Sequence, residues 1–127
     1  MTDLDDFARD LYAAAPTVSE TLAGKAEPDP DIPTLWAGDV GRALADVLPR
    51  LAQEERTAAF AVIDEHLAGS QLMRDVISTG LLEALATRVS GGSLDGPTLA
   101  GLLGPRARAY LDAWDQLTLG RSSLDPS

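Results

Sequence analysis

The stretch that decides the fold is Gln71–Val89, QLMRDVISTGLLEALATRV. Its apolar residues recur at steps of three and four, which is the spacing of one face of an α-helix. That face carries Met73, Val76, Ile77, Gly80, Leu81, Ala84 and Leu85, and it is widened by Leu72, Leu82 and Val89. A helix that is apolar over so much of its circumference belongs at the centre of a bundle. Glycine inside a helix costs about 1 kcal/mol relative to alanine, so we expect Gly80 to let a neighbouring helix approach closely.

Apolar stripes with the same spacing predict further helices on both sides of this stretch. They run from Leu4 to Ala15, from Pro16 to a stop at Gly24, from Thr34 to a kink at Pro49, over 54–68, in a short segment that begins near Pro97, and in a last segment from Pro105 to Leu117. Expected N-caps are Thr2 or Asp3 for the first helix and Ser70 for the central one. Alternation typical of strands is absent, so the predicted fold is all-α, a compact bundle of five to seven helices in antiparallel pairs. We expect one helical domain over residues 1–120 and a frayed polar tail over 121–127.

The one segment that cannot be regular structure is the acidic, proline-rich loop over residues 26–33. It contains Glu27-Pro28-Asp29-Pro30-Asp31-Ile32-Pro33. Three prolines within six residues remove backbone donors and fix the backbone dihedral φ, which predicts a stiff and extended connection.

Charge and composition exclude several classes of function. The 127 residues include 20 acidic and 10 basic side chains, for a net charge of −10. Such a field repels nucleic-acid phosphates and anionic lipid, and it attracts a basic protein, although acidity can also serve solubility alone. The chain has no cysteine, no basic apolar leader and no run long enough to span a membrane. We therefore expect a cytoplasmic protein that binds neither nucleic acid nor membrane.

Catalytic groups are scarce, and we expect no enzymatic activity, no metal and no cofactor. His66 is the only histidine, and no glycine-framed serine accompanies it. Its position near the end of a helix favours a capping or surface role over a catalytic one. The residue three before it is Ile63 and not the glutamate that a di-iron bundle needs. Phosphate-binding and dinucleotide-binding glycine motifs are absent as well.

The acidic residues are distributed unevenly along the chain. Residues 1–48 carry ten acids and three bases, whereas residues 49–127 carry ten acids and seven bases. The predicted partner-binding edge consists of Glu27, Asp29, Asp31, Trp36, Asp39 and Asp46. An aromatic residue beside charges is a common composition for the centre of an interface. The alternative is that Trp36 belongs to the core and the loop is only a solvated connection.

Glu83 interrupts the apolar run Gly80-Leu81-Leu82-Glu83-Ala84-Leu85. Helical rotation places it away from the stripe through Ile77, Leu81 and Leu85, on the exposed side of the central helix. Alternatively, its charge is held by Arg42, by Arg88 or by a cation of a partner.

Three segments together resemble a family of small, acidic, all-helical bacterial proteins with immunity-like roles. They are Ile32–Arg42 (IPTLWAGDVGR), Ile77–Leu85 (ISTGLLEAL) and Leu103–Arg106 (LGPR), and the shared motif positions include Gly80, Glu83, Gly104 and Pro105. The resemblance covers roughly residues 30–115 and includes no catalytic motif. It implies an immunity protein that plugs the active site of a cognate bacterial toxin.

The residues leave three functional hypotheses. The first is an immunity or antitoxin-type inhibitor whose acidic surface covers a basic cleft of a toxin domain. The second is a regulatory or assembly adaptor that binds its partner through an apolar helix groove. The third is a small metal-dependent enzyme that uses acidic residues. The partner and the oligomeric state are not encoded in any recognisable motif.

Overall fold

The computed structural model describes residues 3–118, and the side chains as far as residue 115. The helices are α1 (Asp3–Ala14), α2 (Pro16–Leu22), η1 (Ala23–Lys25), α3 (Pro33–Val47), η2 (Leu48–Arg50), α4 (Gln53–Leu67), α5 (Gln71–Val76), η3 (Ile77–Leu82), α6 (Glu83–Ser90), α7 (Gly96–Leu102) and α8 (Pro105–Thr118). Within this range there is no strand. Because α5, η3 and α6 follow one another as one continuous helix, the all-α prediction of five to seven helices is confirmed. The predicted cap Thr2 and the predicted tail 121–127 lie outside the described residues.

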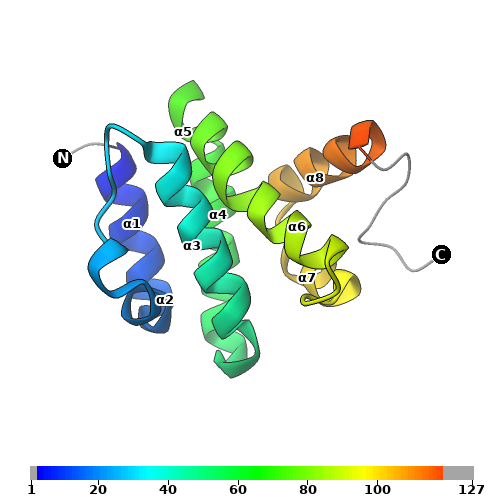
Figure 1. Ribbon diagram of the computed structural model, residues 1–127, viewed down its shortest axis with the longest axis horizontal. Helices are drawn as coiled ribbons and strands as arrows, with labels where there is room; N and C mark the ends of the chain where they lie inside the picture. Colours follow the sequence, from blue (N-terminus) through cyan, green and yellow to red (C-terminus); the bar gives the residue numbers. More distant parts are fainter. Residues whose placement is uncertain (1–2, 119–127) are drawn as a thin grey trace.

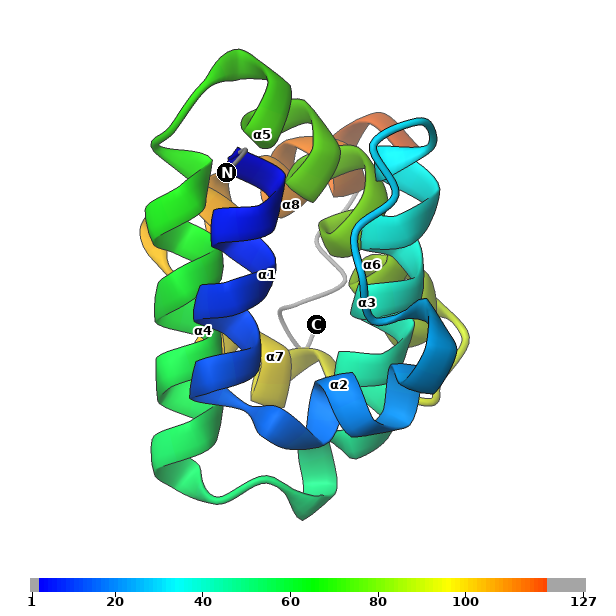
Figure 2. The same cartoon turned by 90° about the vertical axis from the view of Figure 1, so that its left-hand side faces the viewer.

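The bundle contains an antiparallel pair made by α1 and α4. Figure 2 shows these helices side by side and running in opposite directions, and α3 packs against α2 and η3 (Figure 1). The helices α7 and α8 lie at the opposite end of the molecule from α1 and α2 (Figure 1), where both pack against α4. None of the helices within residues 3–118 is long and apolar enough to cross a membrane.

The central helix consists of α5, η3 and α6, which follow one another without a break. The hydroxyl of Ser70 accepts the amide hydrogen of Met73 at 3.2 Å, so the predicted N-cap is confirmed. The middle part, η3, is a π-helix, which the apolar spacing did not predict. Leu72 was expected to widen the apolar face, but it is 63% exposed, whereas Met73 next to it is buried.

Small residues bring η3 and α3 into direct backbone contact. A Cβ atom added to Gly80 would lie 2.6 Å from the Cβ of Ala37 and 2.6 Å from the carbonyl oxygen of Thr34. On the opposing helix, a Cβ added to Gly41 would lie 2.7 Å from the carbonyl oxygen of Leu81. Real side chains do not fit at such distances, so the crossing requires glycine at both positions. The close approach expected at Gly80 is confirmed.

The acidic loop leaves η1 and ends where α3 begins. Pro33 is the first residue of α3, one position earlier than expected, which is a favourable place for proline because it has no amide hydrogen to leave unsatisfied. The α-helix α2 ends at Leu22, two residues before the expected stop at Gly24. The residue at which it ends, Ala23, has a positive φ of 51°, and the single turn η1 follows.

Candidate protein-binding surface

The acids of the loop lie at or near the surface. Glu27 and Asp31 are exposed, and Asp29 is partly exposed. The carboxylate of Asp29 accepts the amide hydrogen of Asp31 at 3.0 Å, which tightens the turn. Within residues 3–118, none of these three carboxylates forms an ion pair. Their negative charge is therefore presented to solvent.

The other two predicted acids of this edge are neutralised within the chain. Asp39 pairs with Arg42 one helical turn away, and Asp46 accepts a hydrogen bond of 2.6 Å from the guanidinium of Arg88 on α6. These two ion pairs and Lys25 line a surface concavity of mixed charge. The free acidic edge is thus narrower than the sequence suggested and is confined to the loop.

Trp36 lies in the core and not on the surface. It is 3% exposed, and its ring meets the ring of Phe7 edge-on with centroids 6.1 Å apart. Its indole Nε1 donates to the carbonyl oxygen of Ala26 at 3.3 Å, and the hydroxyl of Tyr12 donates to the same oxygen at 2.6 Å. Burial raises the pKa of Tyr12 to about 12. The structure gives no exposed aromatic anchor at Trp36, but it gives this residue a role in holding the start of the loop.

An apolar groove adjoins the acidic loop. It has a volume of about 430 Å³ and is lined by Asp3 and Leu4 of α1, Pro30 and Pro33 of the loop, and Leu72, Met73 and Val76 of α5. The exposed large apolar residues of the described chain are Ile32, Leu35 and Leu72. Leu72 lines the groove itself, and Ile32 stands next to the groove-lining Pro33. The sequence did not predict this groove, because its three walls are distant in the chain: the loop follows the start of α1 by about 30 residues, and α5 follows the loop by about 40.

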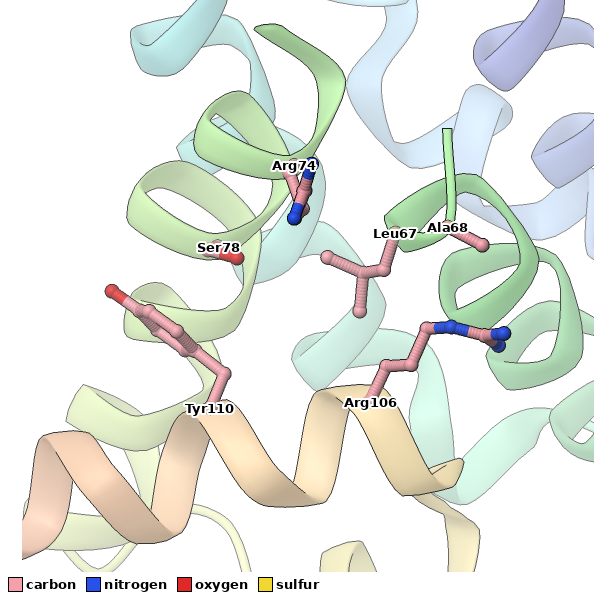
Figure 3. Close-up of a pocket in the computed structure, with 6 residues that line it drawn as sticks. All are labelled: Leu67, Ala68, Arg74, Ser78, Arg106 and Tyr110. Carbon is pink, nitrogen blue, oxygen red and sulfur yellow. The ribbon is translucent and has the colours of Figure 1, made fainter. Parts of the chain in front are cut away.

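A second concavity, of about 510 Å³, opens between the end of α4, the central helix and α8. Figure 3 shows Arg74 and Ser78 reaching it from the central helix, Arg106 and Tyr110 from α8, and Leu67 with Ala68 from the end of α4. Two guanidinium groups beside one cavity are a common arrangement for binding an anion. Here, however, acids surround them. Arg106 is paired with Asp64 at 3.1 Å, and Asp75 and Glu83 lie near Tyr110, so the local charge does not favour an anion.

Glu83 is held by Tyr110 and not by either of the arginines that the sequence suggested. The Tyr110 hydroxyl donates to the carboxylate of Glu83 at 2.5 Å. Burial and the adjacent Glu83 carboxylate raise the pKa of Tyr110 to about 12. This contact joins α6 to α8 and leaves Glu83 partly exposed. Arg42 and Arg88 pair instead with Asp39 and Asp46.

Gly104 and Pro105 form the start of α8, where Asp64 from α4 takes the place of an N-cap. The Asp64 carboxylate accepts the amide hydrogens of Arg106 at 2.9 Å and of Ala107 at 3.0 Å. A Cβ added to Gly104 would overlap with Cγ of Asp64, so only glycine leaves room for this carboxylate. The sequence analysis missed Asp64, because a cap supplied 42 residues earlier in the chain has no local signal.

His66 links α4 to α1. Its Nε2 lies 2.9 Å from the carboxylate of Asp10, and its ring meets Phe7 with centroids 5.2 Å apart. The hydrogen bond from His66 lowers the pKa of Asp10. The expected capping or surface role is therefore replaced by a contact between two helices. In the described residues no hydroxyl bonds to His66, and no group of three or more acidic or histidine residues could hold a metal.

Comparison with known proteins gives no relative from which a role could be transferred. No protein-family model matches the chain, and no curated protein and no solved structure matches it either. The site must therefore be interpreted from its own chemistry.

Proposed function

We propose that this protein is a non-catalytic binding protein of the immunity or antitoxin type, which neutralises a cognate basic protein by covering its cationic cleft. The observation that carries the proposal is the acidic loop, where Glu27, Asp29 and Asp31 have no basic partner within residues 3–118. Free carboxylates on a stiff loop are suited to meet arginine and lysine side chains of a partner. The net charge of −10 supplies a field that attracts such a partner from a distance.

The contrast with Asp39 and Asp46 supports this assignment. Those two carboxylates are occupied by Arg42 and Arg88, so a partner would have to break existing ion pairs to use them. The loop carboxylates form no ion pair within residues 3–118 that a partner would have to break. A cationic partner therefore gains more from the loop than from the flank of α3.

A regulatory or assembly adaptor that binds through an apolar groove is the second candidate. It is favoured by the groove beneath Pro30 and Pro33, with the exposed Leu72 on its wall. The groove and the acidic loop share Pro30 and Pro33, so the two candidates concern neighbouring parts of one surface. They differ in salt dependence, because apolar burial is less sensitive to ionic strength than attraction between exposed charges.

The test begins with affinity capture of the partner from the producing cell, followed by measurement of association rates with the purified pair. The test variant is Glu27→Gln, Asp29→Asn and Asp31→Asn combined. The control variant removes the same charge elsewhere, with Glu20→Gln, Glu54→Gln and Glu65→Gln, three exposed acids without an ion pair in the described chain.

We expect the loop variant to associate roughly tenfold more slowly at low salt, and the control to change much less. The difference should shrink as salt is raised. Equal rates for the two variants would show that total charge, and not the loop, attracts the partner. Unchanged rates for both would contradict the acidic-surface proposal and leave the apolar candidate.

A further inference from the structure

We infer that the apolar groove between α1, the acidic loop and α5 is the docking site for a basic, amphipathic α-helix of the partner. The inference rests on the proposed function and specifies what kind of segment binds. It requires three properties of the site: an apolar floor of sufficient size, a wall that cannot pair with an extended strand, and a rim of negative charge.

The floor of the groove consists of apolar side chains that are held in the core. Met73 and Val76 are 1% and 2% exposed, so they are fixed in the core and offer only their outer surface to the groove. Leu72, which is 63% exposed, lines the same groove. The volume of about 430 Å³ falls in the range of natural ligand pockets and has room for more than one leucine-sized side chain. Burying Leu72 beneath a partner would remove its apolar surface from water.

The wall made by the loop cannot add a β-strand. Pro30 and Pro33 have no amide hydrogen. The amide hydrogens of the two residues between them are already used, because Asp31 donates to the Asp29 carboxylate and Ile32 donates to the Asp29 carbonyl oxygen at 3.2 Å. Residues 30–33 therefore offer no donor to an extended peptide. A helix needs none, since its own backbone is satisfied and it binds through side chains at steps of three and four.

The rim of the groove is acidic. Asp3 lines the groove on the α1 side, and Asp31 lies between the two groove-lining prolines. Arg74, the base next to Met73 in the chain, points into the other concavity (Figure 3). Lysine or arginine side chains that flank the apolar face of a docked helix would therefore meet carboxylates on both sides. Charge complementarity selects a basic helix over an acidic one.

The experiment uses the full-length chain and a fluorescent peptide of about four helical turns, built from leucine at steps of three and four with lysine and alanine elsewhere. A peptide of the same composition with the leucines scrambled is the control probe. Leu72→Ser is the test variant, and Leu35→Ser is its matched control, because Leu35 is also 63% exposed but does not line the groove. Both substitutions are at exposed positions, and thermal melts check that both variants remain folded.

We expect fluorescence polarisation to show that the patterned peptide binds more tightly than the scrambled one. Leu72→Ser should weaken its binding about fivefold or more, and Leu35→Ser by less than twofold. Circular dichroism should show the peptide becoming helical as it binds. Replacing lysine by glutamate in the probe should abolish binding.

Equal affinities for the patterned and scrambled peptides, or equal affinities of the two leucine variants, would overturn the inference. In that case the proposed function would still stand if the triple loop variant associated slowly with the captured partner. A concentration-dependent dimer that is lost in Leu72→Ser would also overturn it, because the groove would then be occupied by a second copy of the chain.

Discussion

Gly80→Ala is the substitution that tests most directly how the bundle is held together. In the structure the new methyl group would lie 2.6 Å from the Cβ of Ala37 and 2.6 Å from the carbonyl oxygen of Thr34. Neither group can rotate away, because one is a methyl attached to the backbone and the other is the backbone itself. The two helices must separate locally before alanine can fit.

Two opposing effects determine the change in the free energy of unfolding. Overpacking a well-filled interior costs about 1–3 kcal/mol. Two contacts below 3.0 Å with rigid atoms place this site in the upper half of that range. Alanine recovers about 1 kcal/mol of helix propensity over glycine. We therefore expect Gly80→Ala to destabilise the protein by about 1–2 kcal/mol.

Gly101→Ala is the matched control. Gly101 is the last residue but one of α7 and is exposed, and no neighbouring atom lies within 4 Å of the position that an added Cβ would take. This variant should be stabilised by about 0.5–1 kcal/mol, because it gains helix propensity without overpacking.

Urea unfolding followed by circular dichroism would measure both changes. The midpoint should fall for Gly80→Ala and rise for Gly101→Ala at an unchanged denaturant slope. If both glycine variants were stabilised equally, the close contact between α3 and η3 would be refuted.

Three further predictions concern polar contacts between helices. Asp64→Ala should destabilise the protein by about 2–4 kcal/mol in urea unfolding, because it removes a buried acceptor of two amide hydrogens and an ion pair, whereas Asp64→Asn should cost less. By NMR, the Asp10 carboxyl should titrate below its ordinary pKa of 3.8, and its pKa should return towards that value in His66→Gln. Since the folded pKa is lowered, the contribution of Asp10 to stability is present above pH 3.8 and is lost as the pH falls through the folded pKa. The pKa values of about 12 for Tyr12 and Tyr110 predict little tyrosinate absorbance at pH 11 in the folded protein; since these pKa values are raised, their contribution to stability is present below pH 10 and is lost as the pH rises from 10 through 12.

The elements that local spacing could predict are those whose cause lies within a few residues. The burial of Met73, Ile77 and Leu85 follows from steps of three and four, and Ser70 caps the helix that begins next to it. The π-helix η3 could not be predicted in this way. Its extra residue per turn changes the hydrogen-bond pattern while it leaves the order of apolar residues unaltered.

The parts of the candidate surface that were missed depend on contacts between distant residues. Asp46 appeared to be a free acid until Arg88, 42 positions later, was placed beside it. The apolar groove has the same origin, because Leu4, Pro30 and Leu72 come together only when α1, the loop and α5 are assembled. A sequence records the charge of each side chain, but it does not record which charges are neutralised by a distant partner. The absence of a helix or strand over residues 26–32 was predicted correctly, since three prolines remove backbone donors from this segment and fix its φ angles.

The core and the binding surface are connected through the carbonyl oxygen of Ala26. It accepts hydrogen bonds from Tyr12 and from Trp36, and Trp36 is itself fixed by burial against Phe7. The start of the loop is therefore tied to α1 and α3, and its other end enters α3 directly at Pro33. A loop held at both ends and stiffened by proline loses little conformational freedom when it binds, so more of the attraction between its carboxylates and a cationic partner remains as affinity. In the proposed function, Trp36 is therefore not the anchor of the interface, and its role is to fix the position of the loop acids.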